Sequence, residues 1–114
     1  MTRNDFTDSL GYLNEKYYLA ARFLATHPGP IKERLLNVAN SVPLAGLKPG
    51  LGIPSDVAKL IGSIPARLYA KNDDSGRGAA AVTLENLPEE AVLAIAHDIC
   101  DVHDQLRTLE EDSR

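Results

Sequence analysis

The chain has 114 residues, enough for one modest hydrophobic core and too few for two, so we expect a single domain over residues 1–114. Hydrophobic residues make up 44% and charged residues 25%, as in ordinary soluble proteins, while the 5% of aromatic residues predicts a mostly aliphatic core. The sequence contains no apolar run near the roughly 18 residues of a membrane span, no leader-like segment and one cysteine, Cys100, which together predict a cytoplasmic protein without an internal disulfide.

The first predicted element is a helix from about Asn4 to Thr26. Its apolar residues recur at alternating spacings of three and four, as on one buried helix face: Phe6, Leu10, Leu13, Tyr17, Ala20 and Leu24. A second apolar row, formed by Tyr12, Leu19 and Phe23, lies about a third of a turn away. Because one neighbour cannot bury both rows, the second row contacts either another helix of the same chain or another subunit.

A short turn leads into the second helix. Pro28 disfavours helical geometry at His27, Gly29 permits a reversal of the chain, and Pro30 suits a first helical turn. We therefore expect a second helix from about Pro30 to Val42, antiparallel to the first because the connection is short. Its buried side consists of Ile31, Leu35, Val38 and Val42.

The segment from Pro43 to Pro54 reads PLAGLKPGLGIP. Its three prolines and three glycines exclude a regular helix, whereas Leu44, Leu47 and Leu51 argue against a solvated linker. We expect an ordered crossing loop that packs onto the bundle. Its glycines lack the Gly-Lys-Ser/Thr ending of a phosphate-binding loop, which argues against nucleotide binding.

A third helix is expected to begin at Ser55, whose hydroxyl can cap it. Its buried side consists of Val57, Ile61, Ile64 and Leu68. Pro65 removes one backbone hydrogen bond of this helix and so predicts a kink or break near residues 62–65. Lys59, Arg67 and Lys71 form a basic row at multiples of four residues, read either as a solvated face or as a docking strip for an anion or an acidic helix.

Residues 72–78, with the sequence NDDSGRG, predict a turn, and Ala79 to Leu84 are expected to be a loop. The last helix is predicted over Asn86 to Asp112, with Asn86 as its N-cap and Pro88 in its first turn. Its buried face consists of Val92, Ile95, Ile99, Val102, Leu106 and Leu109. Together these elements predict an all-α fold, an antiparallel four-helix bundle with a kinked third helix and a Pro/Gly-rich crossing loop.

Candidate chemistry is concentrated on the last helix. His97, Asp101 and Asp104 share one side within reach of a common metal ion, and His97, Cys100 and Asp104 offer a second combination. Both sets point away from the predicted buried face and lack a paired-Cys or His-Glu-x-x-His signature, so surface ion pairs are the favoured interpretation. Cys100 and His103 have no third group to orient them as a nucleophilic pair, and neither a catalytic residue nor a cofactor is predicted.

Charge is distributed unevenly along the chain. Residues 1–83 carry a net charge of +3 and residues 84–114 a net charge of -7. This polarity could attract the last helix to the rest of its own chain, to a second copy or to a basic partner. Lys59, Arg67 and Lys71 are the candidate contacts to nucleic acid, but the calculated pI of 5.3 and the absence of a recognised motif argue against that partner.

Two short stretches, LATHPGPIKERL from Leu24 to Leu35 and LPEEA from Leu87 to Ala91, resemble segments of small uncharacterised bacterial all-helical proteins in which a Leu-Ala-Thr turn precedes an Arg-Leu-containing helix. The resemblance implies a helical fold and brings no activity with it. The long segment from Pro43 to Val82 departs from the shorter spacing of those proteins, and no functional residue is carried over.

The favoured hypothesis is a small, non-catalytic protein-interaction or regulatory module that self-associates through helical faces and has no membrane partner. Its candidate contact residues come from the first and third helices: Tyr12, Leu19, Phe23, Lys59, Arg67 and Lys71. One alternative is a helix-borne metal or small-ligand site that uses His97, Asp101 and Asp104. The other is a nucleic-acid-associated factor.

Overall fold

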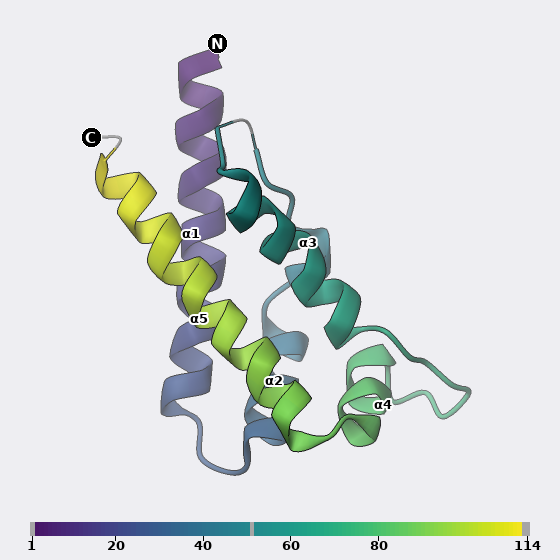
Figure 1. Cartoon of the computed structure of the whole chain (residues 1–114). Helices are drawn as coiled ribbons and strands as arrows, with labels where there is room; N and C mark the ends of the chain where they lie inside the picture. Colours follow the sequence, from purple (N-terminus) through teal and green to yellow (C-terminus); the bar gives the residue numbers. More distant parts are fainter. Residues whose placement is uncertain (1, 51, 113–114) are drawn as a thin grey trace.

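The computed structural model describes the backbone of residues 2–50 and 52–112 and the side chains of residues 10–50 and 52–112. Within these ranges the chain forms five α-helices and one short 3₁₀ helix, and no β-strand (Figure 1). The elements are α1 (Thr2–Thr26), α2 (Ile31–Ser41), η1 (Leu44–Gly46), α3 (Ser55–Leu68), α4 (Ala79–Asn86) and α5 (Glu89–Asp112). The all-α prediction is confirmed. None of the described helices combines the length and the apolar composition that crossing a membrane requires.

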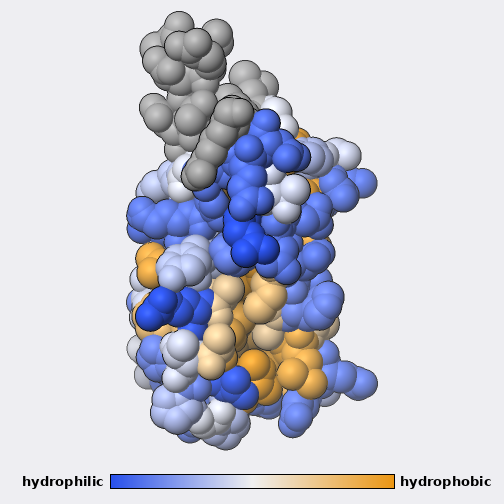
Figure 2. Space-filling view, turned by 90° about the vertical axis from the view of Figure 1, so that its left-hand side faces the viewer, coloured by the Kyte–Doolittle hydropathy of each residue, from blue (hydrophilic) through white to orange (hydrophobic). Residues whose placement is uncertain are grey.

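The two long helices, α1 and α5, make the most extensive helix contact and run antiparallel (Figure 1). Asn14, in the middle of α1, contacts Glu110 near the end of α5, whereas Ala25, near the end of α1, and Ala96, in the first half of α5, line one groove. The remaining helices pack around this pair: α3 on α5, α2 on both α1 and α5, and the short α4 on α2 and α3. The side of the molecule that carries α1 and α5 faces the viewer in Figure 2.

Periodicity identified nearly all residues of the core correctly. On the predicted buried side of α2, Leu35, Val38 and Val42 are buried and Ile31 is half-buried. The predicted buried residues of α1 from Leu10 to Leu24, those of α3, and those of α5 from Val92 to Leu106 are all at most 5% exposed, and Leu109 is half-buried against the core. The side chain of Phe6 lies outside the described residues. Each fully buried aliphatic side chain contributes roughly 1.5–3 kcal/mol through removal of apolar surface from water, so these faces determine how the helices pack.

The crossing loop is ordered and packed, as predicted. Leu44, on η1, is fully buried, and Leu47 is 6% exposed. Both belong to the main hydrophobic core, which explains why a segment rich in proline and glycine follows one path over the helices. Leu51 lies outside the described residues.

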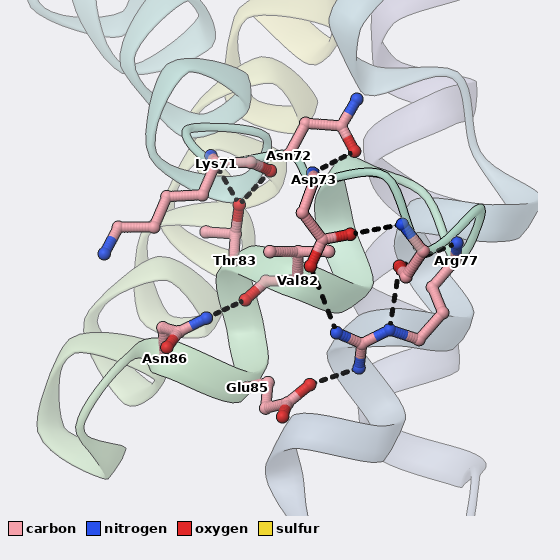
Figure 3. Close-up of polar contacts among 9 residues, drawn as sticks. Lys71, Asn72, Asp73, Arg77, Val82, Thr83, Glu85 and Asn86 are labelled. Atoms are coloured by element: carbon pink, nitrogen blue, oxygen red, sulfur yellow. Dashed lines mark hydrogen bonds and ion pairs between the residues drawn. The ribbon is translucent and has the colours of Figure 1, made fainter.

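A fifth helix, α4, occupies the segment that was predicted to be a loop, so the four-helix prediction is corrected to five. Its residues Ala80, Val82, Thr83 and Leu84 are all buried, and burial around the helix leaves no amphipathic pattern to detect. The Thr83 hydroxyl accepts a hydrogen bond from the Lys71 backbone N–H at 2.8 Å and donates one to the Lys71 carbonyl at 3.1 Å (Figure 3). These bonds fasten α4 to the chain that leaves α3.

The predicted N-terminus of the last helix was also wrong. Asn86 is the last residue of α4, and its side-chain amide donates a hydrogen bond to the Val82 carbonyl at 2.8 Å. Pro88 holds the preceding Leu87 in an extended conformation, which ends α4 and separates it from α5. The Pro88 carbonyl then accepts the first backbone hydrogen bonds of α5, from Ala91 and Val92.

Of the kink or break predicted near residues 62–65, the break is not found, because α3 runs as one helix from Ser55 to Leu68 with Pro65 inside it (Figure 1). The kink stays a prediction. Ile61, Ile64 and Leu68 are fully buried on both sides of the proline, and their packing holds the helix together despite the missing hydrogen bond. Ser55 is the first helical residue rather than the cap, a position held by Pro54, which makes no side-chain capping bond.

The NDDSGRG segment forms a turn that side chains hold in place (Figure 3). The Asn72 side chain accepts a hydrogen bond from the Asp73 N–H, and the Asp73 side chain accepts one from the Ser75 N–H, both at 2.9 Å. Arg77 pairs with Glu85 of α4 and with Asp73. These contacts lower the pKa of the exposed Asp73 carboxyl, mainly through its hydrogen bonds with Ser75, and tie the turn to α4.

Candidate interaction site

An apolar groove lies between the second half of α1 and the first half of α5. Its volume is about 470 Å³, and its lining residues come from α1, α5 and the start of α2: Ala21, Leu24, Ala25, Ile31, Leu93, Ala96, His97 and Cys100. Ala21 and Ala25 are one turn apart on α1, as Ala96 and Cys100 are on α5. Because these four side chains are small, the facing flanks of the two helices leave a depression between them.

Leu93 projects at the edge of this groove with 48% of its surface exposed, which makes it one of the large hydrophobic side chains most open to solvent. Figure 2 shows apolar residues gathered on this side of the molecule, in a continuous patch framed by hydrophilic ones. Scattered exposed leucines are ordinary on soluble proteins, whereas a contiguous apolar depression with a projecting side chain is typical of a binding surface.

The same inter-helix depression becomes polar toward the end of α5. A second hollow of about 300 Å³ is lined there by residues that include Tyr18, His103 and Glu110. The ring centroids of Tyr18 and His103 are 5.7 Å apart, and Arg22 donates a hydrogen bond to the Tyr18 hydroxyl at 2.8 Å. The Asn14 amide donates to the Glu110 carboxylate, joining the two helices beside this hollow.

The predicted apolar row of Tyr12, Leu19 and Phe23 lies on the flank of α1 that faces away from the α1–α5 groove. Its residues differ in burial. Tyr12 is 53% exposed, and the Lys16 ammonium lies 5.3 Å from the centroid of its ring. Leu19 and Phe23 are half-buried and pack against the core of their own chain. The groove beside them, about 220 Å³, is smaller than the α1–α5 groove and includes His27, whose ring centroid is 4.6 Å from that of Phe23.

The basic row of the third helix is partly used within the chain. Arg67 donates a hydrogen bond and forms an ion pair with Asp98 of α5, with the Nη2 and Oδ2 atoms 2.6 Å apart. Lys59 and Lys71 are exposed. Arg67 therefore links α3 to the acidic side of α5, whereas Lys59 and Lys71 have no such role among the described contacts.

The residues considered for a metal site do not form a ligand set. The His97 side chain is 81% exposed, Asp101 accepts a hydrogen bond from Gln105 at 3.4 Å, and Asp104 lies 3.9 Å from Arg107. Across residues 10–50 and 52–112, no three or more His, Cys, Asp and Glu side chains are grouped so that they could hold a metal ion.

Cys100 is a thiol in a setting that disfavours its ionisation. Partial burial, followed by the nearby negative charge of Asp104, raises the pKa of its thiol. A reactive cysteine needs the opposite shift, because the thiolate is the nucleophile. The residue lines the apolar groove as a small side chain.

Sequence reasoning missed a buried hydroxyl in the core. Tyr17 is 0% exposed, and its hydroxyl is among the buried polar atoms of the described residues that have no hydrogen-bond partner. Burial raises the pKa of this phenol well above its ordinary value. The heptad-like spacing marked Tyr17 as buried, but a one-dimensional pattern carries no information about partners for its oxygen.

Comparisons with protein-family models, with curated proteins and with solved structures give no match to this chain, so its function is argued from the surfaces described above.

Proposed function

We propose that this chain is a small, non-catalytic protein-interaction module that binds another polypeptide through the apolar groove between α1 and α5. The observation that carries the proposal is the combination of an apolar groove of about 470 Å³ with Leu93, which is 48% exposed at its edge. Burial of this surface by a partner would remove apolar area from water, the main driving force of protein association.

The shape and lining of the groove favour a polypeptide over a small molecule. Small-molecule sites enclose most of their ligand and place a few convergent polar groups to orient it. Here the lining is aliphatic except for His97 and Cys100, and His97 is directed largely to solvent. A groove between two helices with small residues on both walls suits the apolar face of an amphipathic helix.

The chemistry beside the groove also supports a binding role without catalysis. The raised pKa of the Cys100 thiol makes it a poor nucleophile. The imidazole of His103 lies against the Tyr18 ring. General acid and base work requires a positioned, tuned pair of groups, and the groove offers none among its described lining residues.

Photocrosslinking in the native cell tests the proposal. The photoreactive amino acid p-benzoylphenylalanine is placed at position 93 of the full chain and, as the control, at position 45, where Ala45 is exposed on η1. We expect a crosslinked polypeptide product from position 93 and none from position 45. The absence of any polypeptide product from position 93, or equal yields from both positions, would contradict the proposed function.

A further inference from the structure

We propose that the bond between Arg77 and Gly78 is a proteolytic processing site, which a protease of trypsin specificity cuts while the chain is folded. The proposal does not depend on the groove between α1 and α5. A protease of this type hydrolyses the bond that follows an arginine or a lysine. The C–N bond to Gly78 breaks, and water supplies the hydroxyl of the new Arg77 carboxyl group and a hydrogen of the new Gly78 amine.

The bond lies at the end of an exposed segment that connects α3 to α4. Every residue from 70 to 78 is exposed, and Figure 1 shows this segment extending outward from the helices. Among the described residues, no backbone–backbone hydrogen bond outside the helices involves residues 70–77. A protease binds several consecutive residues in an extended form through their backbone groups, so exposed loops of small and polar residues are the usual sites of cleavage in folded proteins.

The other lysines and arginines of the described chain are less accessible to such a protease. Most of them lie within helices, where the backbone groups are already paired. Outside the helices, Lys48 precedes Pro49, whose ring and missing N–H hinder cleavage of the bond between them. Lys71 has both its N–H and its carbonyl bound by the Thr83 hydroxyl, at 2.8 and 3.1 Å. Arg77 therefore offers the most accessible bond.

The ion pairs of Arg77 control how fast this bond is cut. Its guanidinium pairs with Glu85 of α4 and lies 3.6 Å from the Asp73 carboxylate (Figure 3). A protease of trypsin specificity takes the arginine side chain into a pocket that contains an aspartate, so Arg77 cannot contact Glu85 and this pocket at the same time. Because all three side chains are about half exposed, their ion pairs are weak and slow the cleavage without preventing it.

The two products, residues 1–77 and 78–114, should stay bound to each other. The second product contains α5, whose most extensive contact is with α1 of the first product, and the contacts of α5 with α3 and of α4 with α2 also join the two products. Charge adds to this attraction. Residues 78–83 carry no charged side chain, so the side chains of residues 1–77 have a net charge of +3 and those of residues 78–114 a net charge of -7.

Limited digestion of the full folded chain with trypsin, followed by intact-mass spectrometry, tests the proposal. The first products should be residues 1–77 and 78–114, and they should elute together from a size-exclusion column at the position of the intact chain. Cleavage through global unfolding would instead expose the lysines and arginines of the helices together. A first cut at any other bond, simultaneous cuts within the helices, or separation of the two products on the column would each overturn the proposal.

Glu85→Gln tests the role of the ion pair. It should raise the initial rate of cleavage after Arg77 about two- to fivefold, because exposed ion pairs are weak. Glu15→Gln is the matched control, since Glu15 is an exposed helical glutamate that makes no ion pair within the described part of the chain, and the rate should not change. Circular dichroism checks that both variants are folded. An unchanged rate in Glu85→Gln, or an equal increase in Glu15→Gln, would overturn the control of cleavage by Arg77.

Discussion

Replacement of Tyr17 by phenylalanine should stabilise the fold. The Tyr17 side chain is 0% exposed, and its hydroxyl is one of the buried polar atoms of the described residues without a hydrogen-bond partner. In the unfolded chain water solvates this hydroxyl, so folding removes those hydrogen bonds and returns none. Phenylalanine keeps the ring that fills the core between Leu13 and Leu24 on the same helix face and deletes only the oxygen.

The size of the effect follows from the cost of an unpaired buried polar group, about 1–3 kcal/mol. Part of this cost is offset because the oxygen fills volume that phenylalanine leaves empty. We therefore expect Tyr17→Phe to raise the free energy of unfolding by about 1 kcal/mol, or the melting temperature by roughly 4 °C for a chain of this size. Urea denaturation followed by circular dichroism measures it.

The pH dependence gives a second test with a defined sign. Burial raises the pKa of Tyr17 in the native state, whereas in the unfolded chain it is about 10. Above that pH the unfolded state loses the proton and the native state keeps it, so wild-type stability falls as pH rises. By about pH 11 the loss that comes from Tyr17 is roughly 1.4 kcal/mol. This part of the loss should be absent from Tyr17→Phe, whereas the loss from Tyr69, whose pKa burial also raises, is common to both proteins. The stability difference between the two proteins should thus widen at alkaline pH.

Tyr69 is the control for this prediction. Its hydroxyl donates a hydrogen bond to the Ala39 carbonyl at 3.3 Å, so Tyr69→Phe should lower the free energy of unfolding by about 0.5–1 kcal/mol. Both substitutions remove a tyrosine hydroxyl oxygen, but only the Tyr69 hydroxyl has a hydrogen-bond partner. A Tyr17→Phe variant less stable than wild type would contradict the claim that the Tyr17 hydroxyl is buried without a hydrogen-bond partner. A stability difference that stays constant between pH 8 and pH 11 would contradict it as well.

Two further predictions concern α4 and the glycines. Thr83→Val should lower the free energy of unfolding by about 1–2 kcal/mol, because both hydrogen bonds of the buried Thr83 hydroxyl are lost. Hydrogen exchange of the Lys71 amide should become faster in this variant. Thr83→Ser keeps the hydroxyl and should protect that amide as wild type does. Gly78→Ala should destabilise the fold by about 1 kcal/mol or more, because Gly78 has a φ of 96° that alanine rarely adopts. Gly62→Ala should stabilise the fold by up to about 1 kcal/mol, because Gly62 lies within the helix α3 and an added Cβ meets nothing within 4 Å. Thermal denaturation of each variant checks these opposite signs, and a Gly78→Ala variant as stable as wild type would contradict the left-handed conformation.

Apolar periodicity predicted the helices whose buried residues lie on one face. The rows in α1, α3 and α5 succeeded because each helix buries one side, and a 3.6-residue repeat records that directly. The eight-residue α4 shows no such repeat because Val82 is buried on the side of the helix opposite to Ala80 and Leu84. Contacts with α2 and α3 specify this helix, and those contacts are not visible in a local pattern.

The candidate interaction site was harder to predict because small side chains create it. Ala21, Ala25 and Ala96 attract no attention in a search for large exposed hydrophobic residues, and they form a groove only when the flanks of α1 and α5 face each other. The row that the sequence predicts as a contact surface, Tyr12, Leu19 and Phe23, consists of large side chains. Large apolar side chains in a sequence indicate which face of a helix can be buried. The groove depends instead on which surface stays exposed after α1 and α5 have packed together.

The acidic side of α5 shows how packing assigns different environments to neighbouring charges. Asp98 reaches Arg67 across the α3–α5 contact, whereas His97, one residue earlier, is 81% exposed and lines the edge of the α1–α5 groove. A step of one residue turns a side chain by about 100° around the helix, enough to move it from one neighbour to another. The polarity of the chain thus contributes to internal docking on one flank of α5, whereas the flank that lines the α1–α5 groove remains exposed.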